Sequence, residues 1–244
     1  MTSDLTLNYL LILWSGAFLG AFVAGAGGFG FALAASSIWL HRLTPVQTTT
    51  LIVGCGAILH CGMVWPMRRS IILGRLWPFV AGCLLGIPLG VRLLATLDFA
   101  SLKHILGALL VCFGLYAALV RRLPHLRIGG RGADATVGFM GGILGGLGGF
   151  SGVLPMMWTQ LRGWSPNEAR AVYQPYIIVA QLATLLMMGV FGLDRSGLWL
   201  IVLSLPALLA GVWLGWKLFG YFDEPTFRRV VAVGVALSGL SLIF

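Results

Sequence analysis

Charged residues are scarce in this 244-residue chain, making up 9% of the sequence, and only seven of them are acidic. Soluble globular domains carry about a quarter of their residues as charged side chains. The scarcity therefore excludes a soluble domain and indicates an integral membrane protein. Cysteine is also rare, and all four cysteines lie in apolar stretches of the first half, at Cys55, Cys61, Cys83 and Cys112. We expect them to be reduced core residues, and we expect no metal site and no cofactor, because structural zinc needs four ligands at closed spacing.

Long basic runs are absent too. The net charge of +9 comes from arginines and lysines scattered in ones and twos between apolar stretches. A basic face on a soluble module, which nucleic-acid binding requires, is therefore not predicted. The N-terminus lacks the basic segment and cleavage site of a signal peptide, so we expect residues 5–23 to stay in the mature chain as a span.

What the chain does contain is one glycine motif in two copies. Gly-Ala-Gly-Gly-Phe-Gly occupies residues 25–30, and Gly-Leu-Gly-Gly-Phe-Ser occupies residues 146–151. Leu-Thr-Pro-Val-Gln at residues 43–47 follows the first copy, and Trp-Ser-Pro-Asn-Glu at residues 164–168 follows the second, both at an offset of 121 residues. Glycine clusters that interrupt membrane helices at matching places in two halves point to the binding site of a transporter.

The repeats predict the domain organisation. We expect a first transmembrane repeat at residues 1–120, a cytoplasmic linker at 121–134 and a second repeat at 135–244. The predicted fold is an all-α polytopic membrane protein made of two inverted repeats, each a glycine-broken helical hairpin followed by three transmembrane helices. Polar Thr-Pro and Ser-Pro segments after each hairpin have the pattern of capping boxes, with Thr44 and Gln47 in one copy and Ser165 and Glu168 in the other.

Basic residues set the predicted orientation. If each glycine-broken segment enters and returns on the same side, twelve of the 16 arginines and lysines fall on one side of the membrane. If each segment crosses once, the count is eight against eight. Short cytoplasmic loops carry the excess of basic residues, so the first arrangement is favoured. It gives each repeat an odd number of crossings, which inverts the repeats, with the N-terminus outside and the linker in the cytoplasm. Length favours hairpins with short arms whose tips lie near the midplane of the membrane.

The hairpin tips are candidate anion sites. A helix N-terminus offers unpaired N–H groups and about half a positive charge, so it attracts anions without a charged side chain. Alternatively, the glycines only allow a tight turn and close packing. The candidate residues at the two tips are Gly27, Gly28, Gly30, Gly148, Gly149, Ser151 and Gly152.

A polar stripe follows the second capping box. At 100° per residue, Arg170, Gln174 and Gln181 share one helix face, with Tyr173 and Thr184 on its flanks. Polar groups in a membrane helix should face the protein interior or a wet cavity. At the 121-residue offset, Arg170 corresponds to Thr49 and Gln181 to His60, which predicts a second, weaker stripe. Arg170 can also be read as a residue that extends to the membrane surface, and His60 as a buried hydrogen-bonding residue without a ligand.

The motifs resemble a known family. A glycine-rich motif, a Leu-Thr-Pro segment, the run of three threonines at residues 48–50 and Arg92 after Gly90, repeated in weaker form, resemble the sulfite exporter TauE/SafE family, also called the toluene sulfonate uptake permease family. The resemblance implies a multi-pass permease or exporter of the bacterial inner membrane for a small sulfur-containing or organic anion, such as sulfite or a sulfonate. The second half departs from the family pattern at residues 171–175. Coupling to protons and a homodimer stay open.

Two other functions are considered. Residues 149–152 match the Gly-x-Ser-Gly pattern of an intramembrane protease, but the last histidine, His125, lies in the linker, so no downstream base exists. We therefore expect that the chain is not an enzyme. A passive anion channel is the second alternative. All seven acidic residues are expected at span ends or in loops, which leaves no buried carboxylate for a proton relay and His60 as the mid-span proton carrier.

Overall fold

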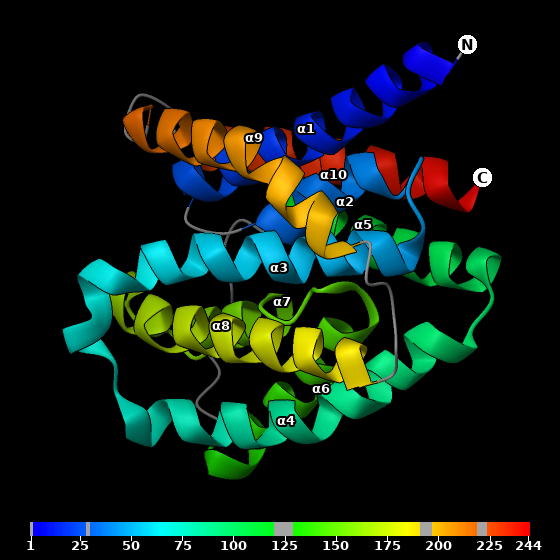
Figure 1. Ribbon diagram of the computed structural model, residues 1–244. Helices are drawn as coiled ribbons and strands as arrows, with labels where there is room; N and C mark the ends of the chain where they lie inside the picture. Colours follow the sequence, from blue (N-terminus) through cyan, green and yellow to red (C-terminus); the bar gives the residue numbers. More distant parts are fainter. Residues whose placement is uncertain (1, 28–29, 120–128, 191–196, 219–223) are drawn as a thin grey trace. The chain divides into compact units, whose positions relative to one another are not determined.

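The structure is a computed structural model, and it describes residues 2–27, 30–119, 129–190, 197–218 and 224–244 (Figure 1). Gly28 and residues 121–128 of the predicted linker lie outside the described residues. Helices account for all of the regular structure within those ranges. They are α1 (Thr2–Gly27), α2 (Phe31–Trp39), α3 (Pro45–Val64), the 3₁₀-helix η1 (Trp65–Ser70), α4 (Leu73–Thr96), α5 (Phe99–Leu119), α6 (Arg131–Gly148), α7 (Val153–Leu161), α8 (Pro166–Val190), α9 (Gly197–Lys217) and α10 (Glu224–Ile243).

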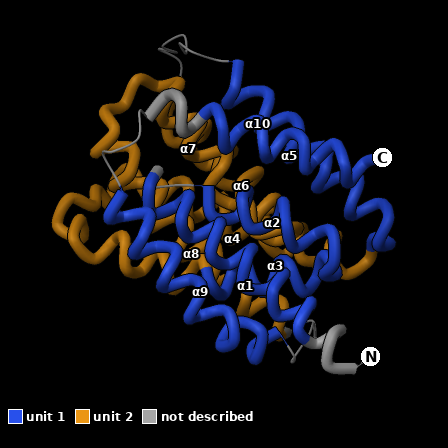
Figure 2. The backbone as a smooth tube through the Cα atoms, turned by 90° about the horizontal axis from the view of Figure 1, so that it is seen from above, with its two compact units in different colours: residues 1–55, 97–121, 196–244 blue, residues 56–96, 122–195 orange. Residues whose placement is uncertain are grey.

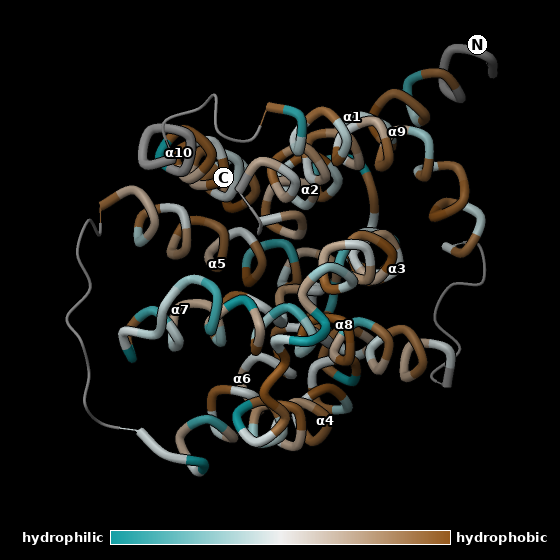
Figure 3. Tube along the Cα trace, turned by 90° about the vertical axis from the view of Figure 1, so that its left-hand side faces the viewer, coloured by the Kyte–Doolittle hydropathy of each residue, from teal (hydrophilic) through white to brown (hydrophobic). Residues whose placement is uncertain are grey.

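Six segments of the described residues are long and apolar enough to cross a membrane. They are Leu7–Ala26, Pro45–Ser70, Leu73–Thr96, Phe99–Leu119, Pro166–Gly189 and Gly197–Lys217. The apolar part of α10, Arg229–Ile243, is shorter. Figure 3 shows the same distribution, with hydrophobic residues along most of each long helix. The prediction of an all-α polytopic membrane protein is confirmed.

Both glycine-broken segments fold back as helical hairpins. In the first hairpin, Gly16 of α1 faces Trp39 of α2, and Gly20 faces Phe31. In the second, Gly145 of α6 faces Ser151, just before α7. The arms are unequal, because α2 and α7 have nine residues each whereas α1 has 26 and α6 has 18. A nine-residue helix is about 14 Å long and cannot cross a core of about 30 Å. The α6 arm, with 18 residues and a length of about 27 Å, is also shorter than this core.

The helices form two compact units, shown in different colours in Figure 2, and each unit is described by itself. Unit 1 comprises residues 1–55, 97–121 and 196–244, and unit 2 comprises residues 56–96 and 122–195. Each unit combines helices from both predicted repeats: α1 packs with α9 in unit 1, and α4 packs with α6 in unit 2. The predicted repeat boundaries stay a prediction.

Glycines bring the paired backbones together by the same contact in each unit. A Cβ on Gly86 of α4 would meet the carbonyl oxygen of Phe139 in α6, and a Cβ on Gly211 of α9 would meet that of Phe18 in α1. Gly211 follows Gly86 by 125 residues, and Phe139 follows Phe18 by 121, which are the offsets of the sequence repeat. The duplicated sequence therefore builds the same close helix contact twice, of the kind that small residues favour in membranes.

Contacts also give the direction of each helix pair. In unit 1, Gly107 of α5 faces Gly239 of α10, and Gly114 faces Ala232. The residue number rises along α5 as it falls along α10, so these two helices are antiparallel. In unit 2, Gly86 faces Phe139 and the later Gly90 faces Ile143, so α4 and α6 are parallel.

Both predicted capping boxes are present. The backbone N–H of Thr44 donates to Gln47 Oε1 at 3.1 Å, and the N–H of Gln47 donates to Thr44 Oγ1 at 3.2 Å. The N–H of Ser165 donates to Glu168 Oε2 at 3.1 Å, and the N–H of Glu168 donates to Ser165 Oγ at 3.4 Å. The N-termini of α3 and α8 are therefore fixed by local sequence.

Cysteine burial corrects one expectation. Cys55 and Cys83 are buried, as a core role requires, but Cys61 and Cys112 are exposed. Apolar surroundings in the sequence indicate a membrane helix, yet they do not say which face of that helix packs against protein.

Candidate functional site

The tip of the second hairpin lies in unit 2. The helix α6 ends at Gly148, and Gly149 adopts the left-handed conformation with φ 79°. The Gly149 N–H donates to the carbonyl of Gly145 at 2.8 Å, and the Phe150 N–H donates to that of Leu144 at 3.2 Å, so the end of α6 is closed by its own backbone. The second arm starts differently, because Gly152, the N-cap of α7, offers no side chain to the first N–H groups. The Val153 N–H donates to the Phe150 carbonyl at 3.3 Å and Pro155 has no N–H, so in the first turn of α7 the Leu154 N–H is left for an outside acceptor.

Ser151 lies at this tip. It is 1% exposed, and its Oγ has no hydrogen-bond partner among the residues that the structure describes. The absence of a side chain at Gly145 makes room for it, since a Cβ there would come within 2.9 Å of the Ser151 Cβ. Buried hydroxyls are nearly always hydrogen-bonded, so this hydroxyl is available to an acceptor that is not part of the described residues.

The tip packs against α8. A Cβ added at Gly152 would meet the Ile177 side chain. Gln174 and Gln181 lie one turn to either side of Ile177 on the same helix face, and Thr184 follows. All three polar residues are buried, and Gln181 Oε1 and Thr184 Oγ1 lack a partner within the described part of the chain. The predicted polar face of α8 thus points into protein rather than lipid.

The second half of α3 covers this face of α8 within unit 2. His60 Nδ1 and Gln174 Oε1 are 2.6 Å apart. Because an amide oxygen can only accept, this assignment puts the ring hydrogen on Nδ1. One turn earlier, Gly56 faces the amide of Gln181, and its missing Cβ leaves the space that this amide fills. Residue numbers rise along α3 as they fall along α8, so these two segments are antiparallel.

Arg170 and Tyr173 lie towards the start of α8. Arg170 is half-buried and interacts with the hydroxyl of the buried Tyr173. Arg170 precedes Ile177 by seven residues, or about 10 Å along the helix axis. The structure therefore places Gln174 and Gln181 beside the tip and Arg170 farther along the same face. A role for Arg170 in binding stays a prediction.

The first hairpin belongs to unit 1. Gly27 ends α1, and Gly30, with φ 92°, is the N-cap of α2 without a side-chain hydrogen bond. Thr49 is fully buried in α3 and has an interaction partner. Gly30 occupies the position that corresponds to Ser151 at the 121-residue offset. The first copy of the motif therefore repeats the uncapped helix start but lacks the hydroxyl.

Asp134 is the residue that sequence reasoning misplaced. It was expected at a span end, with no buried carboxylate in the chain, but it is 6% exposed within α6. Its Oδ1 accepts from Arg162 at 2.9 Å and from Trp158 Nε1 at 2.8 Å. A hairpin reading could have found the pair, because Asp134 and Arg162 both lie 14 residues from Gly148, where α6 ends. The ion pair joins the open ends of the two arms.

These features define a class. Several apolar helices long enough to cross a bilayer, with a buried polar face beside a glycine-broken hairpin, are typical of polytopic membrane transporters. The chain belongs to the Sulfite exporter TauE/SafE family, whose profile matches residues 12–242. It is also similar to a curated protein of Haemophilus influenzae described as a probable membrane transporter protein, with 23% identity over 242 residues that cover 94% of this chain and 92% of the relative. No solved structure matches the chain.

Proposed function

We propose that this membrane transporter is a secondary permease or exporter for a small sulfur-containing or organic oxyanion, such as sulfite or a sulfonate. The observation that carries the proposal is the buried Ser151 Oγ, a hydroxyl donor at the tip beside α7 that has no partner among the described residues. Thr184 Oγ1 is a second hydroxyl that is unpaired within the described part of the chain, seven residues beyond Ile177 on the α8 face that contacts the tip, whereas the unpaired Gln181 Oε1 can only accept. An unsatisfied buried polar group costs about 1–3 kcal/mol, so a buried donor hydroxyl that is left unpaired is explained by a ligand that accepts from it.

The anion would bind to neutral donors. The N-terminus of α7 offers the Leu154 N–H and the positive end of a helix dipole, and Ser151 adds a hydroxyl donor. Gln174 and Gln181 supply amide groups, and His60 holds the Gln174 amide in place by their 2.6 Å contact. A site without a full positive charge binds an anion and still releases it, as transport requires. Arg170, farther along the face, would attract the anion towards the site.

Helix directions support inverted repeats. The α3 and α8 helices are equivalent in the repeat, and so are α5 and α10, and each pair is antiparallel inside its unit. Equivalent helices run antiparallel when the repeats are inverted and parallel when they are not. We therefore keep repeats at residues 1–120 and 135–244, a cytoplasmic linker, the N-terminus outside and a location in the bacterial inner membrane as parts of the proposal.

A ligand screen tests the function. We expect sulfite, thiosulfate or a sulfonate to raise the melting temperature of the purified protein in detergent, since a ligand that binds only the folded state stabilises it. Gln181→Leu should weaken that binding about tenfold, the effect of one lost hydrogen bond to a charged ligand. The matched control is Gln160→Leu, a half-buried glutamine of α7. Unchanged affinity in Gln181→Leu would refute this site, and no shift with any oxyanion would refute the substrate class.

Flux measurements separate a carrier from a passive channel. In proteoliposomes we expect anion flux to saturate with concentration and to follow an imposed proton gradient. His60 would be the proton carrier inside the α3–α8 contact, because its imidazole can take up and release a proton there whereas the amides of Gln174 and Gln181 cannot. Linear flux that ignores the gradient would favour the channel instead.

Orientation has its own test. Gly130 is exposed just before α6. With the exposed Cys61 and Cys112 replaced by serine, a cysteine introduced at Gly130 should resist an impermeant thiol reagent added outside cells. Labelling from outside would overturn the predicted topology and leave the binding site untouched.

A further inference from the structure

We propose that unit 2 carries a binding site for the phosphate headgroup of an anionic phospholipid at the turn between α3 and α4. This turn contains η1, with Arg68 and Arg69, followed by the exposed Ile72 and Leu73. It lies where the candidate span Pro45–Ser70 ends and Leu73–Thr96 begins. The turn therefore lies at a membrane surface, at the depth where phospholipid headgroups are found. The proposal does not depend on the transported anion.

Arg68 and Arg69 carry uncompensated positive charge. The acidic residues within the described part of unit 2 are Asp134 and Glu168, and each is bonded to an arginine elsewhere: Asp134 to Arg162 at 2.9 Å, and Glu168 to Arg75 at 3.1 Å. Arg69 is exposed and makes no ion pair or hydrogen bond to the described residues. The neighbouring carboxylate, Glu168, is already paired with Arg75 in the first turn of α4, so the two guanidinium groups of the turn attract a phosphate, which guanidinium can bind through two parallel hydrogen bonds.

Arg68 is held in position by the turn itself. Its Nη1 donates to the carbonyl oxygen of Trp65 at 2.7 Å, and its guanidinium lies over the Trp65 ring at 4.5 Å from the centroid. Guanidinium groups stacked on an aromatic ring keep their in-plane N–H groups free for an acceptor. One of the two arginines is therefore oriented before any ligand arrives, which lowers the entropic cost of binding.

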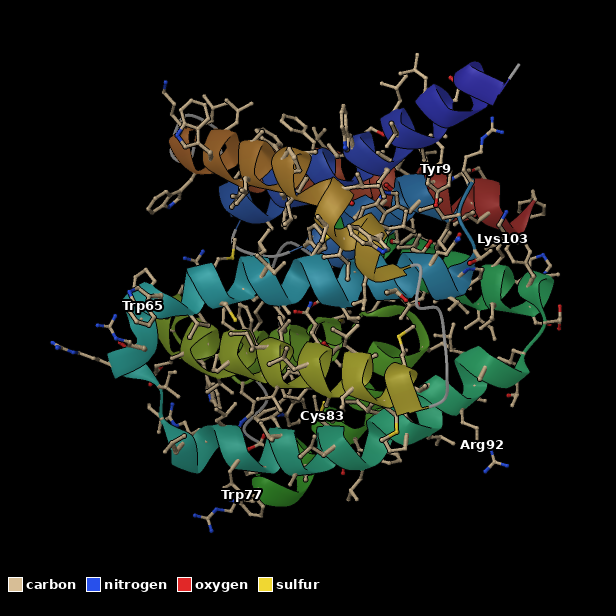
Figure 4. The ribbon with its side chains drawn as sticks, in the orientation of Figure 1. Tyr9, Trp65, Trp77, Cys83, Arg92 and Lys103 are labelled. Atoms are coloured by element: carbon tan, nitrogen blue, oxygen red, sulfur yellow. The ribbon has the colours of Figure 1, made fainter. Side chains whose placement is uncertain are left out.

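Apolar side chains around the arginines select a lipid over a soluble phosphate. Trp65 is 69% exposed, Leu73 is 73% exposed and Trp77 is 56% exposed. Figure 4 shows Trp65 where α3 ends, Trp77 along the first part of α4 and Arg92 towards the other end of α4. Tryptophans gather at the membrane interface, where an amphipathic ring meets headgroup and acyl chain. A soluble phosphate would gain nothing from these surfaces, whereas an acyl chain would cover Leu73 and Trp77.

Lipid titration tests the site. The full chain is purified in detergent, and its melting temperature is followed as dioleoyl phosphatidylglycerol is added, with dioleoyl phosphatidylcholine as the neutral lipid and glycerol 3-phosphate as the soluble phosphate. We expect phosphatidylglycerol alone to stabilise the protein. Arg69→Gln should weaken its apparent affinity about fivefold, and Arg68→Gln/Arg69→Gln about twentyfold, from the usual contribution of one arginine near an anionic surface.

Arg92→Gln is the matched control, since Arg92 is likewise exposed on the solvent or lipid side of α4 but at its other end. It should leave the phosphatidylglycerol response unchanged. Arg69 makes no contact that folding needs, so Arg69→Gln gives a readable answer even if the double variant fails to fold. Equal affinity in Arg69→Gln and wild type, or an equal response to glycerol 3-phosphate, would overturn the proposal. Oxyanion binding should persist in Arg69→Gln, which separates this site from the transported substrate.

Discussion

The two hairpins descend from one glycine motif but are held together by different forces. In the first, Trp39 fills the space left by Gly16, and its Nε1 donates to the Leu13 carbonyl at 3.2 Å. In the second, the Asp134–Arg162 ion pair joins the arms. Packing of a large ring depends on apolar contact, whereas an ion pair depends on partner and geometry. The first hairpin is therefore built as part of the core, and the second as a polar element.

Their buried serines differ in the same way. Ser36 of α2 is fully buried, and its Oγ donates to the Leu33 carbonyl at 3.1 Å. Ser151 at the second tip is equally buried but has no partner among the described residues. The Ser36 hydroxyl is hydrogen-bonded within its own helix, and the Ser151 hydroxyl is left without an acceptor in the described residues. The first hairpin thus satisfies its buried hydroxyl internally, and the second has an unpaired buried hydroxyl at its tip.

The largest change in the free energy of unfolding should come from a substitution in the first hairpin. Trp39→Ala removes a fully buried ring, which also packs edge-on against Phe31 at 6.2 Å between centroids. We expect a loss of about 3–5 kcal/mol and a fall in melting temperature of about 10 °C. Trp213→Ala, at an exposed site in α9, is the control and should change stability by less than about 0.5 kcal/mol. Similar melting curves for the two variants would show that Trp39 does not hold the arms together.

The stability of the second hairpin should depend on the charge of its side chains rather than on their volume. Asp134→Leu leaves Arg162 and the Trp158 N–H without their acceptor, and we expect a loss of about 2–3 kcal/mol. This is less than for a fully buried pair, because the Arg162 side chain keeps 23% exposure. The double variant Asp134→Leu/Arg162→Leu should recover most of the loss, since the unpaired charge is gone.

Arg75→Gln is the control for this experiment. It breaks the exposed pair with Glu168, whose side chains are each 43% exposed, and should cost at most about 1 kcal/mol. Thermal unfolding of all four proteins in one detergent provides the measurement. If the double variant melts as low as Asp134→Leu, the pair stabilises the hairpin through packing, and the contrast with Trp39 disappears.

Substitutions of Ser36 and Ser151 test the two hairpins separately, because one should change stability and the other should change ligand binding. Ser151→Ala removes a hydroxyl that has no partner, so the ligand-free protein should keep its melting temperature or gain up to about 1 kcal/mol. Oxyanion binding should fall about tenfold. Ser36→Ala should do the reverse, with a loss of about 1 kcal/mol and unchanged binding. Calorimetric titration with the best oxyanion checks both, and unchanged affinity in Ser151→Ala would remove the tip from the site.

Local features of this fold could be predicted from sequence, and tertiary ones only in part. The glycine motif predicts a hairpin because glycine, without a Cβ, adopts the left-handed backbone conformation that a tight turn requires. Gly149 has this conformation. The spacing of Gln174 and Gln181 predicts a shared face, since helix geometry fixes it. By contrast, the His60–Gln174 contact depends on how α3 meets α8.

Asp134 shows the same limit. A carboxylate in the first turn of a helix is usually a solvated, dipole-stabilised residue, and nothing local distinguishes Asp134 from that case. Its burial comes from α7 folding back, which brings Trp158 and Arg162 over it. Counting residues from Gly148 places Asp134 opposite Arg162, but this count is valid only if the turn between the two arms is tight.

The smallest predicted effects concern the caps that follow the two hairpins. Thr44→Ala should cost about 1 kcal/mol, the usual effect of losing an N-cap. Ser165→Ala should cost about half as much, because its bond to the Glu168 N–H is long, at 3.4 Å, and Glu168 stays fixed by Arg75. Ser70→Ala, an exposed serine, is the control. If Ser165→Ala costs as much as Thr44→Ala in thermal unfolding, the Arg75 pair does not support the second cap, and the two repeats use their caps equally.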